Sequence, residues 1–173
     1  NKDHYINLIE NRINKLDSFV KDMLNYAKTS RSEIIAEEIN FKTLIDECLD
    51  DLQYLESAAK INIKIDVEAA TKDFYSDKLR LRIIFNNIIS NAFKYYNPHI
   101  ENPSLYIGIK VQEEKVWINL EDNGIGIQEE YLEKIFDMFF RATTKSDGSG
   151  LGMYIVKQTI DRLHGNILVE SSL

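Results

Sequence analysis

Residues 81–96 read LRIIFNNIISNAFKYY, a run whose apolar positions recur at the spacing of a buried helix face. Two asparagines, Asn87 and Asn91, stand one turn apart inside this run, and Lys94 and Tyr95 follow on the next turn. Spacings of three and four place these four side chains near one face of the helix. Asparagine is a mediocre helix former, so a pair of them in mid-helix needs a reason. One interpretation is a solvated polar stripe; the other is a site where amide oxygens hold Mg²⁺ and the lysine meets a phosphate.

A second polar motif, DNGIG at 122–126, follows an alternating strand pattern. Such a stretch is often only a turn. Ile125 and Ile127 keep the segment partly apolar, so the carboxylate of Asp122 needs a hydrogen-bond donor. The exocyclic amine of adenine is one such donor.

Glycine is scarce, at 7 of 173 residues, and six of the seven lie between Gly124 and Gly165. This clustering marks places where the chain turns tightly or lets a ligand approach the backbone. The motif GSGLG at 148–152 leads directly into a predicted helix. Backbone amides of a glycine-rich loop at a helix N-terminus form an anion site. The motif matches neither a Walker A loop nor the dinucleotide-binding fingerprint.

In this order and at these separations, the three motifs resemble those of the catalytic, ATP-binding domain of sensor histidine kinases. Type II topoisomerases, heat-shock chaperones and mismatch-repair ATPases share the superfamily. Residues 87–95 resemble its N box, 122–126 its G1 box, 135–141 its F box and 148–153 its G2 box. The loop 142–149 falls where the family has its mobile ATP lid.

The resemblance implies a role for each residue of the first two motifs. Asn91 would hold Mg²⁺, with Asn87 supporting it one turn earlier. Lys94 would reach a phosphate and Tyr95 would lie against the nucleotide. Asp122 would accept a hydrogen bond from the adenine amine.

The remaining ATP-binding residues implied by the resemblance belong to the two glycine motifs and to the lid region, which supplies two basic residues. Gly124 and Gly126 would allow close approach of the base, and Arg141 and Lys145 would meet the outer phosphates. The glycine-rich loop that would cradle the triphosphate consists of Gly148, Ser149, Gly150, Leu151 and Gly152. Three phenylalanines are expected either to anchor the base of the lid or to belong to the core: Phe136, Phe139 and Phe140.

The residue at position 87 helps to choose among the relatives. Members that hydrolyse ATP carry a glutamate there, whereas Asn87 cannot accept a proton at neutral pH. Transfer of the γ-phosphate to a better nucleophile than water is therefore the expected use of bound ATP. The family's acceptor is a histidine followed by an acidic residue and a proline, and His4, His99 and His164 lack that context. We expect the acceptor on a helix outside this chain, so the fragment alone is expected to be inactive.

The N-terminal segment has a different organisation. Seven apolar residues spaced alternately by three and four form a heptad seam: Ile6, Ile9, Ile13, Leu16, Val20, Met23 and Ala27. It resembles the second helix of the kinase dimerisation hairpin and predicts pairing with another copy rather than packing on its own domain. We therefore expect a partial dimerisation helix at 1–31 and an ATP-binding domain at 32–173.

The pattern of the second part predicts an α+β fold, a two-layer sandwich of a mixed sheet with helices on one face. Short strands are expected at 37–41 and 61–67, a hairpin at 105–121, and helices at 41–55, 76–96, 131–136 and 153–163. Gly165 is the predicted left-handed terminator of the last helix. A strand beginning at 167–170 would close the chain, and the family's final strand lies outside it, which predicts an uncovered sheet edge. The strands and helices are not expected to alternate as βαβ units.

Composition limits the possible partners and the location of the protein. The net charge of −7 argues against nucleic acid, the single cysteine indicates a reducing, cytosolic compartment, and no apolar run is long enough to span a bilayer. Any membrane contact is expected only through segments outside this chain, and the implied protein partner is a response regulator receiver domain. Three other interpretations stay open: an ATPase clamp, a serine kinase acting on an anti-sigma partner, and a non-catalytic nucleotide-binding dimerisation module.

Overall fold

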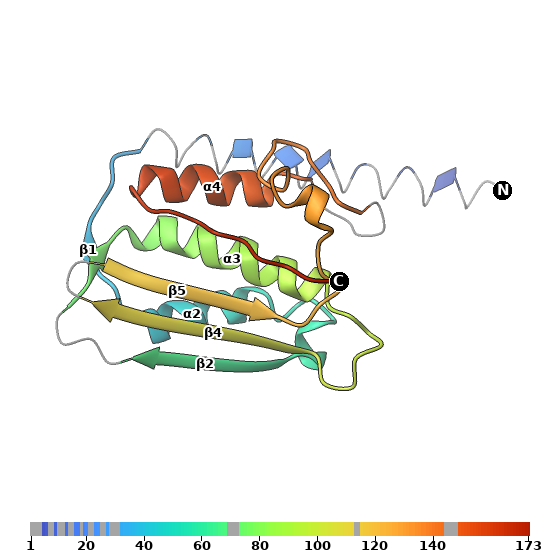
Figure 1. Cartoon of the computed structure of the whole chain (residues 1–173). Helices are drawn as coiled ribbons and strands as arrows, with labels where there is room; N and C mark the ends of the chain where they lie inside the picture. Colours follow the sequence, from blue (N-terminus) through green and yellow to red (C-terminus); the bar gives the residue numbers. More distant parts are fainter. Residues whose placement is uncertain are drawn as a thin grey trace.

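The computed structural model describes residues 32–68, 73–112, 115–143 and 149–173, together with scattered positions between 5 and 27 that are all helical. It has two layers, a sheet and a group of helices that cover one of its faces (Figure 1). The predicted α+β sandwich is therefore confirmed. In the part of the chain that the structure describes, no helix combines the length and the apolarity needed to cross a membrane.

The main sheet has the strand order β2 (Asn62–Glu68), β4 (Ser104–Gln112) and β5 (Lys115–Asp122). β4 and β5 form the predicted hairpin, with Gln112 opposite Lys115. β2 runs parallel to β4. Parallel neighbours need a crossover connection, and the chain makes it through a helix. This βαβ unit was not predicted, because alternation within a strand does not reveal which strand lies beside it.

Three helices, α2 (Phe41–Asp51), α3 (Lys78–Lys94) and α4 (Gly152–Arg162), form the second layer. Each of the first two begins at a side-chain cap: Asn40 Oδ1 accepts from the Thr43 amide at 3.0 Å, and Asp77 Oδ1 accepts from the Arg80 amide at 2.9 Å. These caps satisfy amides that have no partner within the helix. α3 packs against both α2 and α4, so it is the central helix of the layer (Figure 1).

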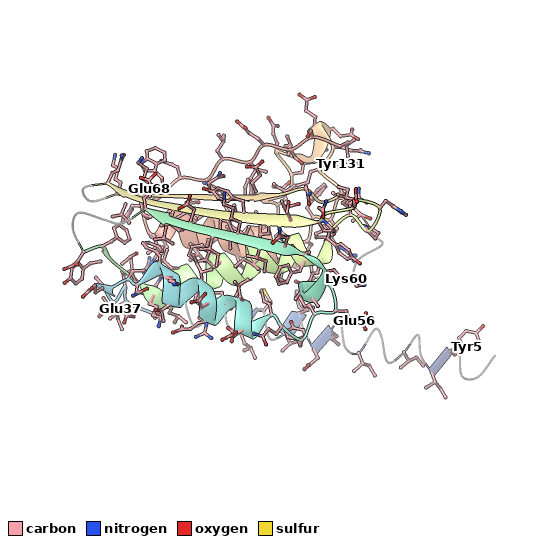
Figure 2. The ribbon with its side chains drawn as sticks, turned by 90° about the horizontal axis from the view of Figure 1, so that it is seen from below. Tyr5, Glu37, Glu56, Lys60, Glu68 and Tyr131 are labelled. Atoms are coloured by element: carbon pink, nitrogen blue, oxygen red, sulfur yellow. The ribbon has the colours of Figure 1, made fainter. Side chains whose placement is uncertain are left out.

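The core lies between the helices and the inner face of the sheet, and the outer face of the sheet is open (Figure 2). Alternation along β4 buries Leu105, Ile107 and Ile109. The fully buried residues that meet them from α2 and α3 are Leu44, Ile45, Cys48, Phe85 and Ile89. Burial raises the pKa of the Cys48 thiol to about 12, so this cysteine stays protonated at neutral pH.

Several short elements differ from the sequence-based predictions. β1 (Glu37–Glu38) pairs with β3 (Tyr75–Ser76) but has only two residues, because Asn40 already caps α2. Two single turns of 3-10 helix occur, η1 (Ala58–Lys60) and η2 (Glu129–Tyr131). The predicted helix at 131–136 is a series of turns that follow η2.

The C-terminal segment also departs from the predictions. α4 ends at Arg162, and His164, not Gly165, occupies the left-handed region, with φ of 57°. Gly165 takes the next position, where its amide donates to the Ile160 carbonyl at 2.9 Å, as in a Schellman motif. Residues 167–170 form no strand ladder, so the predicted strand there is wrong. The segment is held instead by a side chain, since the Ile127 amide donates to Ser171 Oγ at 2.9 Å.

Candidate functional site

The start of α4 lies directly against α3. A Cβ atom on Gly152 would lie 2.9 Å from Oδ1 of Asn87. The Nδ2 atom of Asn87 donates to the Ile83 carbonyl at 2.8 Å, which fixes the amide so that its oxygen faces Gly152. Gly152 of the glycine-rich motif and Asn87 of α3 are thus brought together.

The DNGIG motif meets the other end of α3. The Ile125 amide donates to the Tyr95 carbonyl at 3.0 Å, and a Cβ atom on Gly124 would lie 2.6 Å from the same carbonyl oxygen. Asp122 Oδ1 accepts from the Gly124 amide at 2.9 Å, which closes a tight turn after β5. The carboxylate is exposed and lies at the C-terminal end of β5.

Asn91 lies between these two contacts. Tyr95 comes eight positions after Asn87, a helical rise of about 12 Å. Asn91 stands one turn from each. Both asparagines are half-buried, whereas Lys94 is exposed in the last turn of the helix. The residues from 87 to 95 therefore form the part of α3 that lies between its contacts with the two glycine motifs.

The glycine-rich loop is fastened to the F-box segment. The Phe139 amide donates to the Gly150 carbonyl at 3.1 Å, and Gly150 has a φ of 74°. A Cβ atom there would lie within about 3 Å of the Phe139 backbone, at 2.8 Å from its carbonyl carbon, so the position requires glycine. The Leu151 amide donates to Ser149 Oγ at 3.3 Å.

The phenylalanines of this segment are not all core residues. Phe139 is 54% exposed, and its ring centroid lies 5.9 Å from that of Phe19 on the N-terminal helix. Phe140 packs against Tyr131 at 5.6 Å, and Phe136 is half-buried.

Not every predicted residue is placed among these contacts. The close neighbour of Gly126 is the C-terminal segment, since its Cβ atom would lie 2.1 Å from the Ser172 carbonyl oxygen. Arg141 is half-buried at the end of the F-box segment. Lys145 and Gly148 lie outside the described residues.

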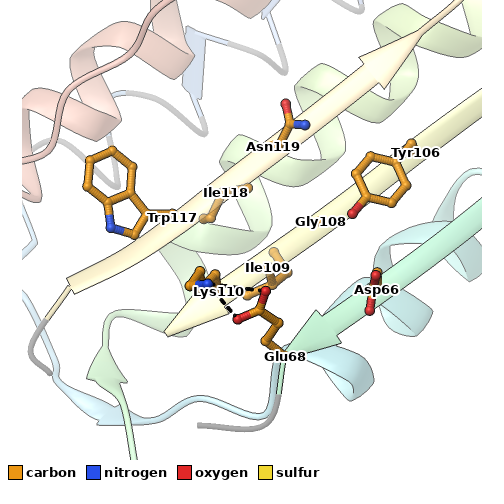
Figure 3. Close-up of a pocket in the computed structure, with 9 residues that line it drawn as sticks. All are labelled: Asp66, Glu68, Tyr106, Gly108, Ile109, Lys110, Trp117, Ile118 and Asn119. Atoms are coloured by element: carbon orange, nitrogen blue, oxygen red, sulfur yellow. Dashed lines mark hydrogen bonds and ion pairs between the residues drawn. The ribbon is translucent and has the colours of Figure 1, made fainter. Parts of the chain in front are cut away.

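A depression of about 240 Å³ lies on the open face of the sheet, away from these motifs (Figure 3). Its floor is Gly108, over which the Tyr106 ring folds, and Trp117 forms one wall. Lys110 Nζ and Glu68 Oε2 form an ion pair of 2.9 Å at its edge. None of the predicted nucleotide-binding residues lines it. A lone glycine inside a strand pattern, here Gly108, indicates a close approach of other atoms to the backbone.

The described residues contain no cluster of three or more His, Cys, Asp or Glu side chains that could hold a metal ion. The amide oxygen of Asn91 stays the predicted ligand, and it is of the oxygen type that Mg²⁺ takes together with substrate phosphates. The donor chemistry of α3 therefore fits a magnesium ion that arrives with a nucleotide.

A mixed sheet covered by three helices, with amides on the central helix between two glycine turns, defines the class of ATP-binding domains found in histidine kinases. The family described as histidine kinase-, DNA gyrase B- and HSP90-like ATPase matches residues 76–173, and the chain belongs to this family.

Individual relatives and solved structures are similar to this chain. The chain is 30% identical over 166 residues to the methanogenesis regulatory histidine kinase FilI of Methanothrix harundinacea, covering 95% of this chain and 18% of that protein. Among solved structures, full-length ShkA in complex with AMPPNP superposes with a TM-score of 0.72 at 22% identity, over 97% of this chain and 36% of that chain. Histidine kinase ThkA in complex with response regulator protein TrrA gives a TM-score of 0.65 at 26% identity, over 93% and 44%. The chain spans 18–22% of the length of the first three curated relatives.

Proposed function

We propose that this chain is the ATP-binding catalytic module of a two-component sensor histidine kinase, which transfers the γ-phosphate of ATP to a histidine on a separate helix. In that step a histidine nitrogen bonds to the γ-phosphorus, the bond to the β,γ-bridging oxygen breaks, and ADP leaves with the electron pair. The proton of the attacking imidazole passes to solvent. A cytosolic location belongs to the same proposal.

The observation that carries the proposal is the contact of the Asn87 amide with Gly152 at the start of α4. This contact puts an amide, which cannot activate water, next to the loop suited to the phosphates. The protein would then act by positioning the nucleotide and neutralising charge, as in other phosphoryl transfers.

Within this proposal, Asn91 holds Mg²⁺ and Asn87 supports it, while Lys94, Arg141 and Lys145 meet phosphate oxygens. The ion would neutralise phosphate charge. Asp122 accepts from the adenine amine and Tyr95 lies beside the base. The other nucleotide contacts proposed are those of Gly124, Gly126, Gly148, Ser149, Gly150, Leu151 and Gly152.

Two protein partners complete the proposal. Heptad residues of the N-terminal helix are exposed, among them Ile9, Ile13 and Leu16, which favours pairing with a second copy. A response regulator receiver domain is the proposed acceptor downstream, supported by the likeness to ThkA in complex with TrrA.

Binding of a non-hydrolysable ATP analogue tests the site. We expect Mg²⁺-dependent binding that weakens by roughly 10-fold to 100-fold in Asn91→Ala, which removes the proposed ligand of the ion, and in Asp122→Ala, which removes about 1.5–3 kcal/mol of charge-assisted hydrogen bonding. Isothermal titration calorimetry with and without Mg²⁺ measures this. Asn86→Ala is the matched control, because Asn86 Nδ2 faces Asp51 on α2 at 3.3 Å. Equal affinity in all four proteins would contradict the proposed site.

Transfer of labelled phosphate distinguishes the reaction classes. We expect label on histidine in a separately supplied acceptor-helix fragment, stable to base and labile to acid. Steady ATP hydrolysis without an acceptor would indicate the ATPase clamp, and label on serine would indicate the serine kinase. Tight binding with no transfer in a full-length kinase would indicate a non-catalytic module.

A further inference from the structure

A buried ion pair lies at the first turn of α3, away from the residues of the nucleotide site. Arg80 is 1% exposed and Asp77 is 4% exposed. Nη1 of Arg80 donates to Oδ2 of Asp77, and the other carboxylate oxygen caps the helix. Burial acts to raise the pKa of the Asp77 carboxyl, but hydrogen bonds from the Arg80 and Ile35 amides and from the guanidinium together hold that pKa below its usual value.

Further hydrogen bonds of Asp77 and Arg80 join this pair to the segment that follows the N-terminal helix. Arg80 Nη2 donates to the Ser32 carbonyl at 2.8 Å and to Ser32 Oγ at 3.2 Å, and Nη1 donates to the Glu33 carbonyl at 3.2 Å. The Ile35 amide donates to Asp77 Oδ2 at 3.1 Å. Four bonds therefore join α3 to a stretch more than 40 residues earlier in the chain.

The residues of the segment 32–36 are all exposed. The segment has no regular secondary structure, and its apolar side chains Ile34 and Ile35 are 42% and 72% exposed. Because these side chains bury little area, the backbone of the segment is positioned by the polar bonds from α3 rather than by the hydrophobic core.

The pair differs from the other ion pairs of α3. Lys78 with Glu47 and Arg82 with Asp51 have side chains that are 34–40% exposed, and exposed pairs contribute little to stability. A buried pair is no better for stability than well-packed apolar residues. The buried guanidinium instead fixes the orientation of the backbone at 32–33, because its planar group donates to the Ser32 and Glu33 carbonyls at once.

We propose that Asp77 and Arg80 are positioning residues that clamp the linker 32–35 to the first turn of α3. The clamp sets the direction in which the N-terminal helix leaves the ATP-binding domain. The same helix α3 carries Asn87 and Asn91, so the clamp fixes the N-terminal helix relative to the candidate site.

Distances between two spin labels test the clamp in the full chain without nucleotide. Leu24→Cys on the N-terminal helix and Gln158→Cys on α4 supply exposed thiols. The native Cys48 is buried with a raised pKa and does not compete for the label. Dilution with unlabelled chain removes distances between copies, and pulsed electron paramagnetic resonance gives the distance distribution.

We expect a narrow distribution for the parent and at least a twofold broader one for Arg80→Met. Arg82→Met, which removes an arginine two residues away that bonds to Asp51 on α2, should keep the parent width. Asp77→Asn retains a side-chain cap for α3 but loses the charge pairing, and it should broaden the distribution as well.

Ile89→Val controls for loss of stability, because Ile89 is fully buried in the core, nine residues after Arg80 on α3. Circular dichroism shows which variants are folded, and if Arg80→Met is unfolded, Asp77→Asn and Arg80→Lys decide the test. Widths equal to the parent in the folded clamp variants, or equal broadening in Ile89→Val, would overturn the proposal. Because no nucleotide is added, the outcome is independent of the proposed kinase function.

Discussion

Gly124 lies where the loop after β5 passes the last turn of α3. Its missing side chain allows the passage, because a Cβ atom would lie 2.6 Å both from the Tyr95 carbonyl oxygen and from Asp122 Oδ1. The first of these neighbours is backbone at the end of a helix and cannot move without shifting that helix. Gly108 is a useful contrast, because the atoms near its Cβ position belong to the Tyr106 ring, the nearest being the hydroxyl at 2.8 Å.

Gly124→Ala should therefore lower the free energy of unfolding by about 1–3 kcal/mol, the usual cost of forcing an extra methyl group into a packed site. Gly108→Ala is expected to change it by less than about 1 kcal/mol, because the tyrosine ring can rotate away and alanine is favoured over glycine in a strand. Urea denaturation followed by circular dichroism measures both. Equal losses in the two variants would show that the Tyr95 contact does not limit position 124.

Asp77→Asn should change how stability depends on pH. The folded-state pKa of Asp77 lies below the reference value of 3.8, so its contribution is fully present above that value and is lost as the pH falls through the folded pKa. The parent should exceed the variant in stability at pH 6, and the difference should shrink below about pH 4. Urea midpoints between pH 6 and pH 3 test this, and a difference that stays constant or widens on acidification would contradict it.

Single residues show where prediction from sequence succeeds. The helix predicted from residue 76 begins at the Asp77 cap, a start that sequence can indicate because capping depends on residues three positions apart. The bonds of Arg80 to Ser32 and Glu33 gave no sequence signal, since they join residues 47 and 48 positions apart. The predicted roles of Asn91 and Asp122 stay predictions until nucleotide binding is measured.

Among the elements, the N-terminal helix has an apolar seam whose large side chains are exposed. Ile13 is 60% exposed and Leu16 is 62% exposed, which is costly for large apolar side chains in a row. Phe19, one residue from the seam, is instead turned toward Phe139.

Ile13→Asp should abolish self-association without abolishing binding of the ATP analogue, because a charge in a heptad seam disrupts pairing while the site lies on other elements. Sedimentation velocity of the parent and variant measures the first effect and calorimetry the second. Glu10 lies outside the seam, so Glu10→Asp is a control for the substitution itself. Loss of analogue binding together with association would show that the helix is integral to the ATP-binding domain.

Elements with strong local patterns were predicted well. The alternation in 105–121 predicts β4 and β5, and the helical spacing in 81–96 predicts α3. The strand predicted at 167–170 failed because alternation shows that a segment can be a strand but does not supply a neighbour to pair with. The parallel pairing of β2 with β4 was missed for the same reason.

For the whole molecule, the described hydrophobic core begins at Ile39 and includes no earlier residue. The N-terminal helix contributes one described ring contact to the rest of the chain, between Phe19 and Phe139. The proposed division at residues 31 and 32 thus has a physical basis in the core, and the division itself can be tested.

Removal of residues 1–31 should leave a folded domain. The lost aromatic contact is worth about 1 kcal/mol, so the melting temperature should fall by no more than about 4 °C. Ser32 and the bonds of Arg80 remain in the shortened chain. Differential scanning calorimetry measures the change, and an unfolded or much less stable product would show that the helix belongs to the domain.

The length of α3 has a mechanical consequence. The helix spans Lys78–Lys94, about 25 Å at 1.5 Å per residue, and its clamp and its asparagines lie at different points along that length. Such a rod acts as a lever: a tilt of about 5° about its first turn would displace its last turn by about 2 Å. A movement of the linker would thus displace Tyr95 and the Gly124 turn at the far end of the helix. The displacement would be comparable in size to the methyl group that Gly124 lacks.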